Sequence, residues 1–312
     1  MDCFDKILDS CKYVVDNSKY VKINEDKINE LVLNMDLIKP NHWLMSNPYG
    51  ILNYDINELI HFLFIFGSID CSFWGEPKWQ IEDNGKFVDG AFGLLYVLTK
   101  IKKEIGYLDF TRISYNVFEE YFTGNIKTPL IKERYKIVRE VSEIINNKFD
   151  GNIYEEIKDM TSDIDLFNFI VSNFSSFKDE RTYGEKTIYF YKLAQLLTSD
   201  ILHIRENLEN IKVDYFHLVG CSDYKIPQVL RGLGILEYNS ELSNLVDNKI
   251  EILENSKYEI EIRASMIIVI NMIKEKVNGK MSAIEINDMI WGMGQDKSKK
   301  LKPYHLTRTL NY

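Results

Sequence analysis

The sequence has few cysteines and histidines, and their spacing excludes two common kinds of site. The five histidines show no HxxxH or HExxH spacing, which is the pattern of a helical zinc site. A disulfide framework or a zinc knuckle needs paired cysteines. The 312 residues hold four cysteines without a CxxC pair: Cys3, Cys11, Cys71 and Cys221. We therefore expect reduced thiols, no metal site and no cofactor.

Long hydrophobic runs and an excess of positive charge are also absent. No apolar run approaches the roughly 18 residues that cross a bilayer, and the first 20 residues mix acids and lysines, unlike a signal peptide. The formal net charge of −9 opposes binding to nucleic acid, because that affinity depends on Lys and Arg. No heptad repeat or long apolar stripe is present. We expect a cytoplasmic monomer that binds neither membrane nor nucleic acid.

Helical periodicity is present over most of the chain. Apolar residues recur at three- and four-residue spacings, which predicts helices over 2–17, 24–36, 55–68, 108–121, 129–148, 163–175, 185–209, 257–277 and 282–292. The one clear strand signal is the stretch 79–88, where apolar residues flank Asn84-Gly85, a pair suited to a two-residue hairpin turn. The six prolines are scattered, and no linker or repeat marks a boundary. We predict a single all-α domain over 1–312 with one small β-hairpin, and a division into two lobes stays open.

The stretch IDCSFWGEPKW, residues 69–79, is rich in aromatic side chains beside a glycine and a proline. Aromatic residues mostly serve cores, so one interpretation is a buried turn. The other is an aromatic wall for a planar base, formed by Phe73 and Trp74. Such stacking contributes on the order of 1–3 kcal/mol per base.

The stretch KTIYFYKLAQLLTSD, residues 186–200, places a lysine in an apolar segment. A helix that starts near Ile188 puts Lys192, Gln195 and Ser199 on one face. A lysine in such a place must reach out to solvent, pair with a carboxylate or face a cleft. Asp200 lies near the same face and is a candidate partner for Lys192.

The stretch GCSDYKIPQVLRGLG, residues 220–234, places the carboxylate of Asp223 before a short apolar helix. Pro227 suits the first turn of that helix. Asp223 then lies beside the amino end of that helix, where the macrodipole favours the ionised form and predicts a depressed pKa. The small residues Cys221 and Ser222 leave room for a ligand. An equally simple interpretation makes Asp223 a helix cap or the ion-pair partner of Lys225 or Arg231.

The stretch YEIEIRASMIIVINMI, residues 258–273, opens an apolar helix with charged residues. Acids belong at a helix amino end, and Glu259 with Arg263 forms an i, i+4 pair. This pattern favours an architectural role. The alternative is that Arg263 holds a catalytic carboxylate in place.

Six blocks taken together, in their order and spacing, resemble the queuosine salvage family, the queuosine 5′-phosphate N-glycosylases. The blocks are SIDCSFWGEPKW, TPLIKERYKIV, YFYKLAQLLTSD, SDYKIPQVLRGLG, EIEIRA and KPYHLTRTLNY, and the resemblance covers the chain from about residue 40 to 312. The resemblance implies an all-α domain similar to helix-hairpin-helix DNA glycosylases. It also implies hydrolysis of queuosine 5′-monophosphate to queuine, a 7-deazaguanine, and ribose 5-phosphate, which salvages queuine for tRNA modification.

The resemblance further implies roles for individual residues. Asp223 is the catalytic carboxylate and Lys192 borders the ribose phosphate. Lys225 stands in place of the usual arginine, and Cys221 stands where an aromatic side chain often stacks on the base. The expected substrate-binding residues are Lys192, Tyr191, Phe73, Trp74, Ser72, Cys221, Ser222, Tyr224, Gln228, Arg263 and His42.

The chemistry of this reaction explains the need for a carboxylate. Cleavage of an N-glycosidic bond builds positive charge on the anomeric carbon, so Asp223 is expected to stabilise or attack that centre. Ordinary purines are protonated at N7 as they leave, and a 7-deazapurine lacks this nitrogen. The protein must therefore assist departure through other atoms of the base, by hydrogen bonds or by a proton. Two alternatives remain at this stage: a DNA base glycosylase with a cooperating lysine and aspartate, and a non-catalytic carrier of queuine or a nucleotide.

Overall fold

The computed structural model describes residues 2–35, 40, 42–295 and 300–312, and helices dominate these residues. The helices are α1 (Cys3–Asp16), α2 (Glu25–Leu33), α3 (Ile56–Ser68), α4 (Gly90–Ile105), α5 (Tyr115–Tyr121), α6 (Ile131–Lys148), α7 (Ile153–Ile157), α8 (Asp163–Asn173), α9 (Lys192–Leu208), α10 (Lys225–Gly232), α11 (Ser240–Asp247), α12 (Lys257–Lys276) and α13 (Ala283–Met293). Short 3-10 turns lie at Trp43–Ser46, Ile51–Asn53 and Ser175–Phe177. The mainly helical class predicted from periodicity is confirmed.

The described residues form three two-stranded antiparallel sheets, so the prediction of a single hairpin is wrong. The pairs are β1 (Val21–Ile23) with β6 (Leu236–Tyr238), β2 (Ile81–Asp83) with β3 (Lys86–Val88), and β4 (Glu180–Tyr183) with β5 (Lys186–Tyr189). The predicted hairpin is β2–β3, and Asn84 and Gly85 both have the positive φ of a type I′ turn (50° and 79°). The other strands have three or four residues, too few for a periodic signal.

Several helix boundaries also differ from the prediction. Strand β5 occupies the start of the predicted helix 185–209, because Gly184, with φ 62°, turns the chain into a hairpin. The predicted helix 108–121 is helical from Tyr115, after the Ser114 cap. Residue 36, the last of the predicted helix 24–36, lies outside the described residues.

Helix α4 escaped prediction, although it forms part of the site described below. Its glycines weaken the helical signal, yet Gly93 is needed for packing. A Cβ at Gly93 would lie 2.9 Å from Cζ3 of the Trp79 ring. Helix α4 therefore approaches the loop after α3 more closely than a larger residue would allow.

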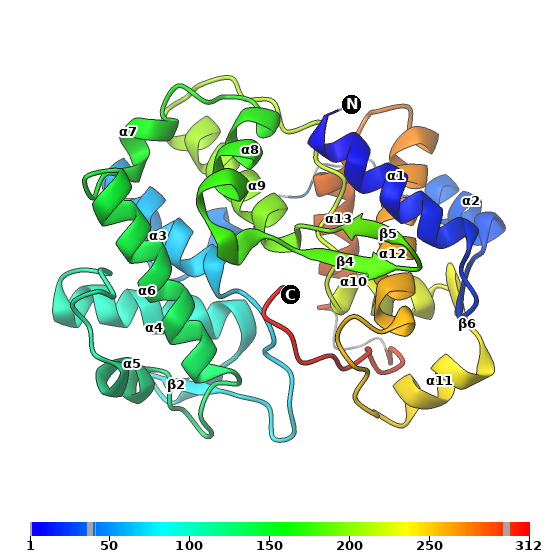
Figure 1. The fold of residues 1–312 in the computed structure, drawn as a ribbon, viewed down its shortest axis with the longest axis horizontal. Coiled ribbons are helices and arrows are strands. Elements are labelled where there is room, and N and C mark those ends of the chain that lie inside the picture. The colour runs from blue at the N-terminus through cyan, green and yellow to red at the C-terminus, as the bar shows by residue number, and fades with distance from the viewer. Residues whose placement is uncertain (1, 36–39, 41, 296–299) are drawn as a thin grey trace.

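The helices form two groups with α9 between them (Figure 1). One group contains α3 to α7, and the other contains α1, α2 and α10 to α13. Helix α9 packs against α3 and α8, and its side chains from Leu193 to Leu202 are almost all buried. One continuous cluster of buried apolar side chains includes residues of both groups. A functional site between the groups would thus rest on a shared core.

The C-terminal stretch 300–312 crosses between the two groups as extended chain (Figure 1). The Trp74 indole N–H donates to the Thr307 carbonyl at 2.9 Å, and the Ser72 N–H donates to the Tyr312 carbonyl at 2.8 Å. The Tyr312 ring covers the Arg263 guanidinium, 4.4 Å away. This stretch therefore fixes the loop that follows α3.

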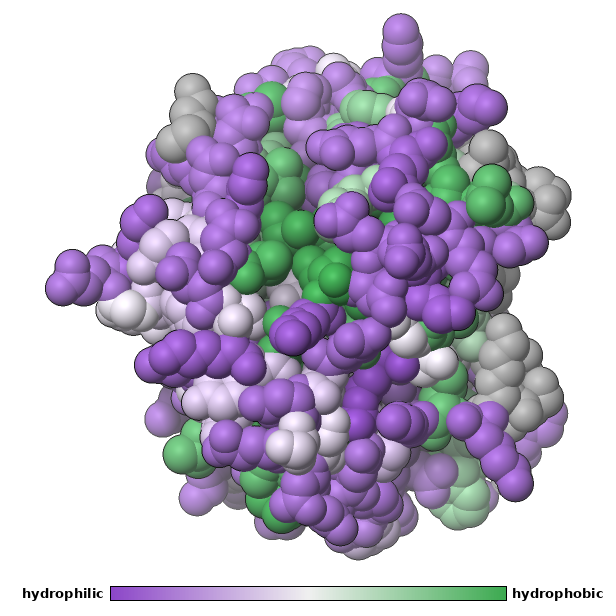
Figure 2. All heavy atoms as spheres, turned by 90° about the vertical axis from the view of Figure 1, so that its right-hand side faces the viewer, coloured by the Kyte–Doolittle hydropathy of each residue, from purple (hydrophilic) through white to green (hydrophobic). Residues whose placement is uncertain are grey.

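The surface is mainly hydrophilic on the face that carries α2 and α11. Figure 2 shows mainly hydrophilic residues, with a hydrophobic area near the centre of this face and other hydrophobic residues toward its edges. Among the described residues, no helix combines the length and apolar character that a membrane span requires.

Candidate active site

Two adjoining cavities form one cleft between the two groups of helices, here called the Asp223 cleft. The apolar cavity has a volume of about 330 Å³ and the polar cavity about 130 Å³. Six residues line both: Asp70, Ala91, Phe92, Lys192, Asp223 and Trp291. The two carboxylates and the ammonium among them place concentrated charge at the junction of the cavities.

Asp223 lies at the amino end of α10 and is partly exposed to the cleft. Its Oδ1 accepts the backbone N–H groups of Lys225 at 2.9 Å and Ile226 at 3.0 Å, so its side chain binds the first turn of α10 from one residue before the N-cap position, which Tyr224 occupies. The predicted depression of its pKa is wrong: burial raises the pKa of Asp223 despite the lowering effects of Lys192 and the two N–H donors. Desolvation of the carboxylate raises its pKa by more than the N–H groups of the helix end lower it.

The suggested ion pair between Asp223 and Arg231 is also wrong. Arg231 makes a bidentate pair with Asp247, at 2.7 and 3.0 Å. The Lys225 ammonium lies over the Tyr304 ring, 5.4 Å from its centre. Arg231, which is itself buried, is therefore committed to Asp247 rather than to Asp223.

Lys192 is the first residue of α9, and it pairs with Asp70. Its Nζ donates to the Asp70 carbonyl at 3.1 Å and lies 3.3 Å from Oδ2 of the same residue. The side chains of Lys192 and Asp70 are 7% and 9% exposed. Burial alone would lower the pKa of Lys192, but the negative charges of Asp70 and Asp223 raise it above its ordinary value. Lys192 is therefore a protonated, fixed cation in the cleft.

The expected pairing of Lys192 with Asp200 is wrong. Eight residues along a helix correspond to about 12 Å of rise, which is beyond the reach of a direct contact. Asp200 instead accepts from the Trp43 indole N–H at 3.1 Å and lies 3.1 Å from Nε2 of His42. Burial raises the pKa of Asp200 to about 8, so it keeps its proton at neutral pH.

The apolar cavity offers aromatic walls and one acidic edge. Trp43, Phe92 and Trp291 line it together with Asn287 and Asp288 of α13. The Asn287 amide donates to Asp288 at 3.2 Å, and its Oδ1 accepts the Cys221 N–H at 3.0 Å. Burial raises the pKa of Asp288 to about 6. This cavity suits a planar ring that carries N–H donors along one edge.

The polar cavity has features that favour an anion. Lys78 and Lys225 line it, as do Gly90 and Ala91 at the amino end of the 16-residue helix α4. Asp89 does not cap this helix with its side chain and pairs with Lys78 at 2.7 Å. Burial, and then the charge of Lys78, lower the pKa of Lys225. Backbone N–H groups at a helix start together with lysines are a recurring phosphate site.

The structure brings six of the predicted site residues to the Asp223 cleft. They are Asp223, Lys192, Phe73, Ser72, Cys221 and Tyr224. Phe73 is only 5% exposed, stacks on Trp79 and lies under the Arg134 guanidinium. Its ring is therefore largely covered by the protein itself.

The other six predicted residues do not line the cleft, and most of them have partners elsewhere. They are Tyr191, Trp74, Ser222, Gln228, Arg263 and His42. The Tyr191 hydroxyl donates to Glu180 at 2.5 Å, and the Ser222 hydroxyl donates to the Arg263 carbonyl at 3.1 Å. The Gln228 amide donates to the Lys302 carbonyl at 2.6 Å. These contacts hold the surrounding elements in place.

Sequence reasoning missed several residues that line the cleft. They are Asp70, Lys78, Phe92, Asp288 and Trp291. Asp70 carried a detectable signal, because it is an acid at the end of an apolar helix, inside the aromatic stretch 69–79. The residues of α4 and α13 carried none, since tertiary packing alone brings them to the cleft.

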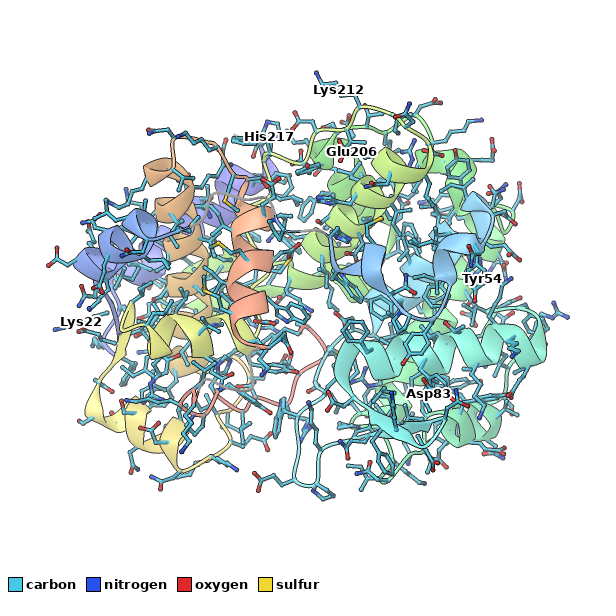
Figure 3. The ribbon with its side chains drawn as sticks, turned by 180° about the vertical axis from the view of Figure 1, so that it is seen from behind. Lys22, Tyr54, Asp83, Glu206, Lys212 and His217 are labelled. Atoms are coloured by element: carbon cyan, nitrogen blue, oxygen red, sulfur yellow. The ribbon has the colours of Figure 1, made fainter. Side chains whose placement is uncertain are left out.

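One group of possible metal ligands occurs among the described residues, made up of Asp163, Asp214 and His217. Oδ2 of Asp163 accepts the backbone N–H groups of His217 at 2.7 Å and Leu218 at 3.1 Å. His217 lies at the edge of the molecule (Figure 3), and its ring nitrogen is 2.9 Å from Asp163 Oδ1. These hydrogen bonds tie the loop before Asp223 to α8, which is a structural role.

Comparison with known proteins identifies similarity over most of the chain. The sequence pattern of the family described as queuosine salvage protein matches residues 52–312. The queuosine 5′-phosphate N-glycosylase/hydrolase of Sphaerobacter thermophilus is 30% identical over 265 residues, which is 81% of each chain. The protein of the same name from Dictyostelium discoideum is 27% identical, and the match spans 95% of each chain. The protein of that name from Mus musculus is 26% identical, and the match spans 97% of this chain and 98% of the mouse protein. The matched range includes every cleft residue except Pro40 and Trp43.

Proposed function

This chain belongs to the queuosine salvage protein family, and we propose that it hydrolyses queuosine 5′-monophosphate to queuine and ribose 5-phosphate. It is a hydrolase that acts on an N-glycosyl bond. The observation that carries the proposal is the carboxylate of Asp223 at the junction of a polar and an apolar cavity. A nucleotide has the same order of parts, with an anionic phosphate, a reacting sugar and a planar base.

In this arrangement Asp223 faces the anomeric carbon of the ribose. Loss of the base leaves an oxocarbenium-like centre, which a nearby carboxylate stabilises or attacks. Lys192 borders the ribose on its phosphate side, and its charge opposes the rise in the pKa of Asp223 that burial causes. The ammonium thus favours the ionised form of Asp223 that the reaction needs.

The base lies in the apolar cavity between Trp43, Phe92 and Trp291. Phe73 and Trp74 were expected to hold the base, but their rings are covered by other side chains. We assign that role to Trp43, Phe92 and Trp291 instead. A 7-deazaguanine presents N–H donors on its pyrimidine edge, and an ionised carboxylate accepts such donors well. Asp288 is placed to do so, with Cys221 leaving space for the ring.

The binding of queuine is expected to tighten by roughly tenfold between pH 5 and pH 7. Asp288, with a pKa of about 6, is about nine-tenths protonated at pH 5 and must lose that proton to accept two N–H groups. Of the groups that face it, Asp200 keeps its proton in this range, Glu285 caps α13, and burial lowers the pKa of His42. Quenching of tryptophan fluorescence by queuine measures the dissociation constant.

The variant Asp288→Asn should bind queuine more weakly and lose most of this pH dependence. The control is Asp150→Asn, at an exposed position whose φ of 49° asparagine tolerates. A dissociation constant of Asp288→Asn that still falls tenfold from pH 5 to pH 7 contradicts the role of Asp288.

The phosphate lies in the polar cavity, at the start of α4 and within reach of Lys78 and Lys225. We expect Lys225→Gln to raise KM for queuosine 5′-monophosphate by roughly 10-fold or more, because a charge-assisted hydrogen bond contributes about 1.5–3 kcal/mol. Cleavage of the nucleoside queuosine, if detectable, should change by less than about twofold. Lys212→Gln is the control, since Lys212 projects from the surface (Figure 3). Equal losses on both substrates would place the phosphate elsewhere.

The reaction itself is tested by chromatography of products from queuosine 5′-monophosphate, queuosine and guanosine 5′-monophosphate, each incubated with the purified protein. Release of queuine from the first substrate alone supports the activity and the phosphate requirement. A carrier would retain the nucleotide intact, so absence of free base from all three substrates would contradict the proposal.

The proposed function also implies an architecture, a cellular compartment and an oligomeric state. We propose a single domain with the arrangement of helix-hairpin-helix glycosylases, acting as a cytoplasmic monomer on a free nucleotide. The protonated state of Lys192 supports this over a DNA glycosylase that forms a Schiff base, since such a lysine must lose its proton to react. The four free cysteines fit a reducing compartment.

A further inference from the structure

A second carboxylate, Asp70, lines the cleft, and hydrolysis requires a group that it can supply. Water must lose a proton as it attacks the anomeric carbon, and an aspartate next to the reacting centre is a suitable acceptor. We propose that Asp70 is the general base that takes this proton. The inference rests on the proposed N-glycoside hydrolysis and adds a second catalytic residue to it.

The position of Asp70 supports this role. Among the described residues, Asp70 and Asp223 are the two acidic side chains that line both cavities. Lys192 is coupled to both, with its Nζ 3.3 Å from Asp70 Oδ2 and its pKa raised by the charges of Asp70 and then Asp223. The ammonium therefore contacts Asp70 directly and interacts electrostatically with Asp223 at the same junction. Such a pair of carboxylates allows one to face the sugar and the other to face the water.

The backbone around Asp70 is fixed by a buried arginine on another helix. Arg134 of α6 is fully buried, and its two terminal nitrogens donate to the carbonyls of Ile69 and Cys71, the residues on either side of Asp70. Its Nε donates to the Pro129 carbonyl at 2.8 Å. A buried charge committed to the two flanking carbonyls holds Asp70 in one position before substrate arrives, which is the kind of preorganisation that catalysis requires.

The proposed step balances as follows. The water oxygen forms a bond to the anomeric carbon while its proton passes to the Asp70 carboxylate. The C1–N bond breaks and its electron pair leaves with the base, which takes up one proton from solvent and becomes queuine. If Asp223 first forms an ester with C1, the same deprotonated water breaks that C1–O bond instead. Asp70 then returns its proton to solvent, and the other product is ribose 5-phosphate.

The test is the turnover of Asp70→Asn with and without sodium azide. We expect kcat for queuosine 5′-monophosphate to fall by about 10²–10⁴-fold, with KM changed by less than about threefold. Azide attacks without losing a proton, so it should restore release of queuine and yield ribosyl azide 5-phosphate, detectable by mass spectrometry. The asparagine can still accept a hydrogen bond from Lys192.

A purely structural role for Asp70 predicts a different result. Its loss would then lower kcat and the melting temperature together, and azide would neither restore turnover nor appear in a product. Either that result or full activity of Asp70→Asn overturns the inference. If Asp70→Asn does not fold, Asp70→Ser is assayed in the same way. Wild-type protein that releases no queuine would instead overturn the proposed function.

Discussion

Asp223→Asn is expected to lower kcat for queuosine 5′-monophosphate by at least ~10²-fold, because it removes the negative charge that stabilises the oxocarbenium-like centre. The fold should be preserved. The two backbone N–H groups of α10 donate to Oδ1 of Asp223, and the Oδ1 of an asparagine can accept both of them, although more weakly than a carboxylate. KM should change little, because the phosphate and the base contact other residues.

The measurement is the steady-state rate of queuine release, followed by chromatography over a range of substrate concentrations, with Asp150→Asn as the matched control. Its side chain is exposed, so the control should match the wild type. If Asp223→Asn folds and retains more than about a tenth of the wild-type kcat, the role of Asp223 is wrong. Asp223→Glu adds a useful contrast, since it keeps the charge and displaces it by about one bond length.

The location of the Asp223 site could be predicted from local sequence, whereas its electrostatics could not. The small residues before Asp223 and the proline after it specify a helix start, and the structure has one there. The pKa shift has the opposite sign from the prediction because burial comes from distant elements, including α4 and α13. A helix end is a local feature of sequence, but desolvation is a property of the folded chain.

The same distinction explains the partners of Lys192. Spacing indicated that this lysine lies in an apolar segment and needs a carboxylate or a cleft, and both are present. The partner was predicted along the helix, at Asp200, because periodicity relates residues of a single element. Asp70 lies 122 residues away in the chain, and only the packing of α3 against α9 brings the two side chains together.

Arg263→Met is expected to reduce the free energy of unfolding by about 3–5 kcal/mol, because it leaves buried carboxylates without their counterion. The guanidinium pairs with Asp179 at 2.5 Å and with Glu259 at 3.4 Å, and all three side chains are 0–2% exposed. The rings of Phe190 and Tyr312 lie against it, 4.1 and 4.4 Å away. The melting temperature should fall by roughly 5–10 °C.

The control Arg139→Met removes an exposed arginine from a comparable i, i+4 pair with Glu143, in which both side chains are 46–49% exposed. Arg139→Met should reduce the free energy of unfolding by less than about 1 kcal/mol. Because Arg263 does not line the cleft, the folded fraction of Arg263→Met should keep kcat/KM within a few-fold of the wild type. A loss of kcat/KM above about 10²-fold, without a change in stability, would instead assign Arg263 to catalysis.

The pH dependence of this destabilisation identifies its cause. Burial already raises the pKa of Glu259 in the presence of Arg263, and removal of the guanidinium should raise it further. A carboxylate whose pKa is higher in the folded than in the unfolded state contributes stability at low pH and loses it as pH rises through the folded pKa. The stability gap between Arg263→Met and the wild type should therefore be smaller at pH 5 than at pH 7.5, as measured by denaturant unfolding. A gap independent of pH would mean that lost packing, rather than unpaired charge, destabilises the variant.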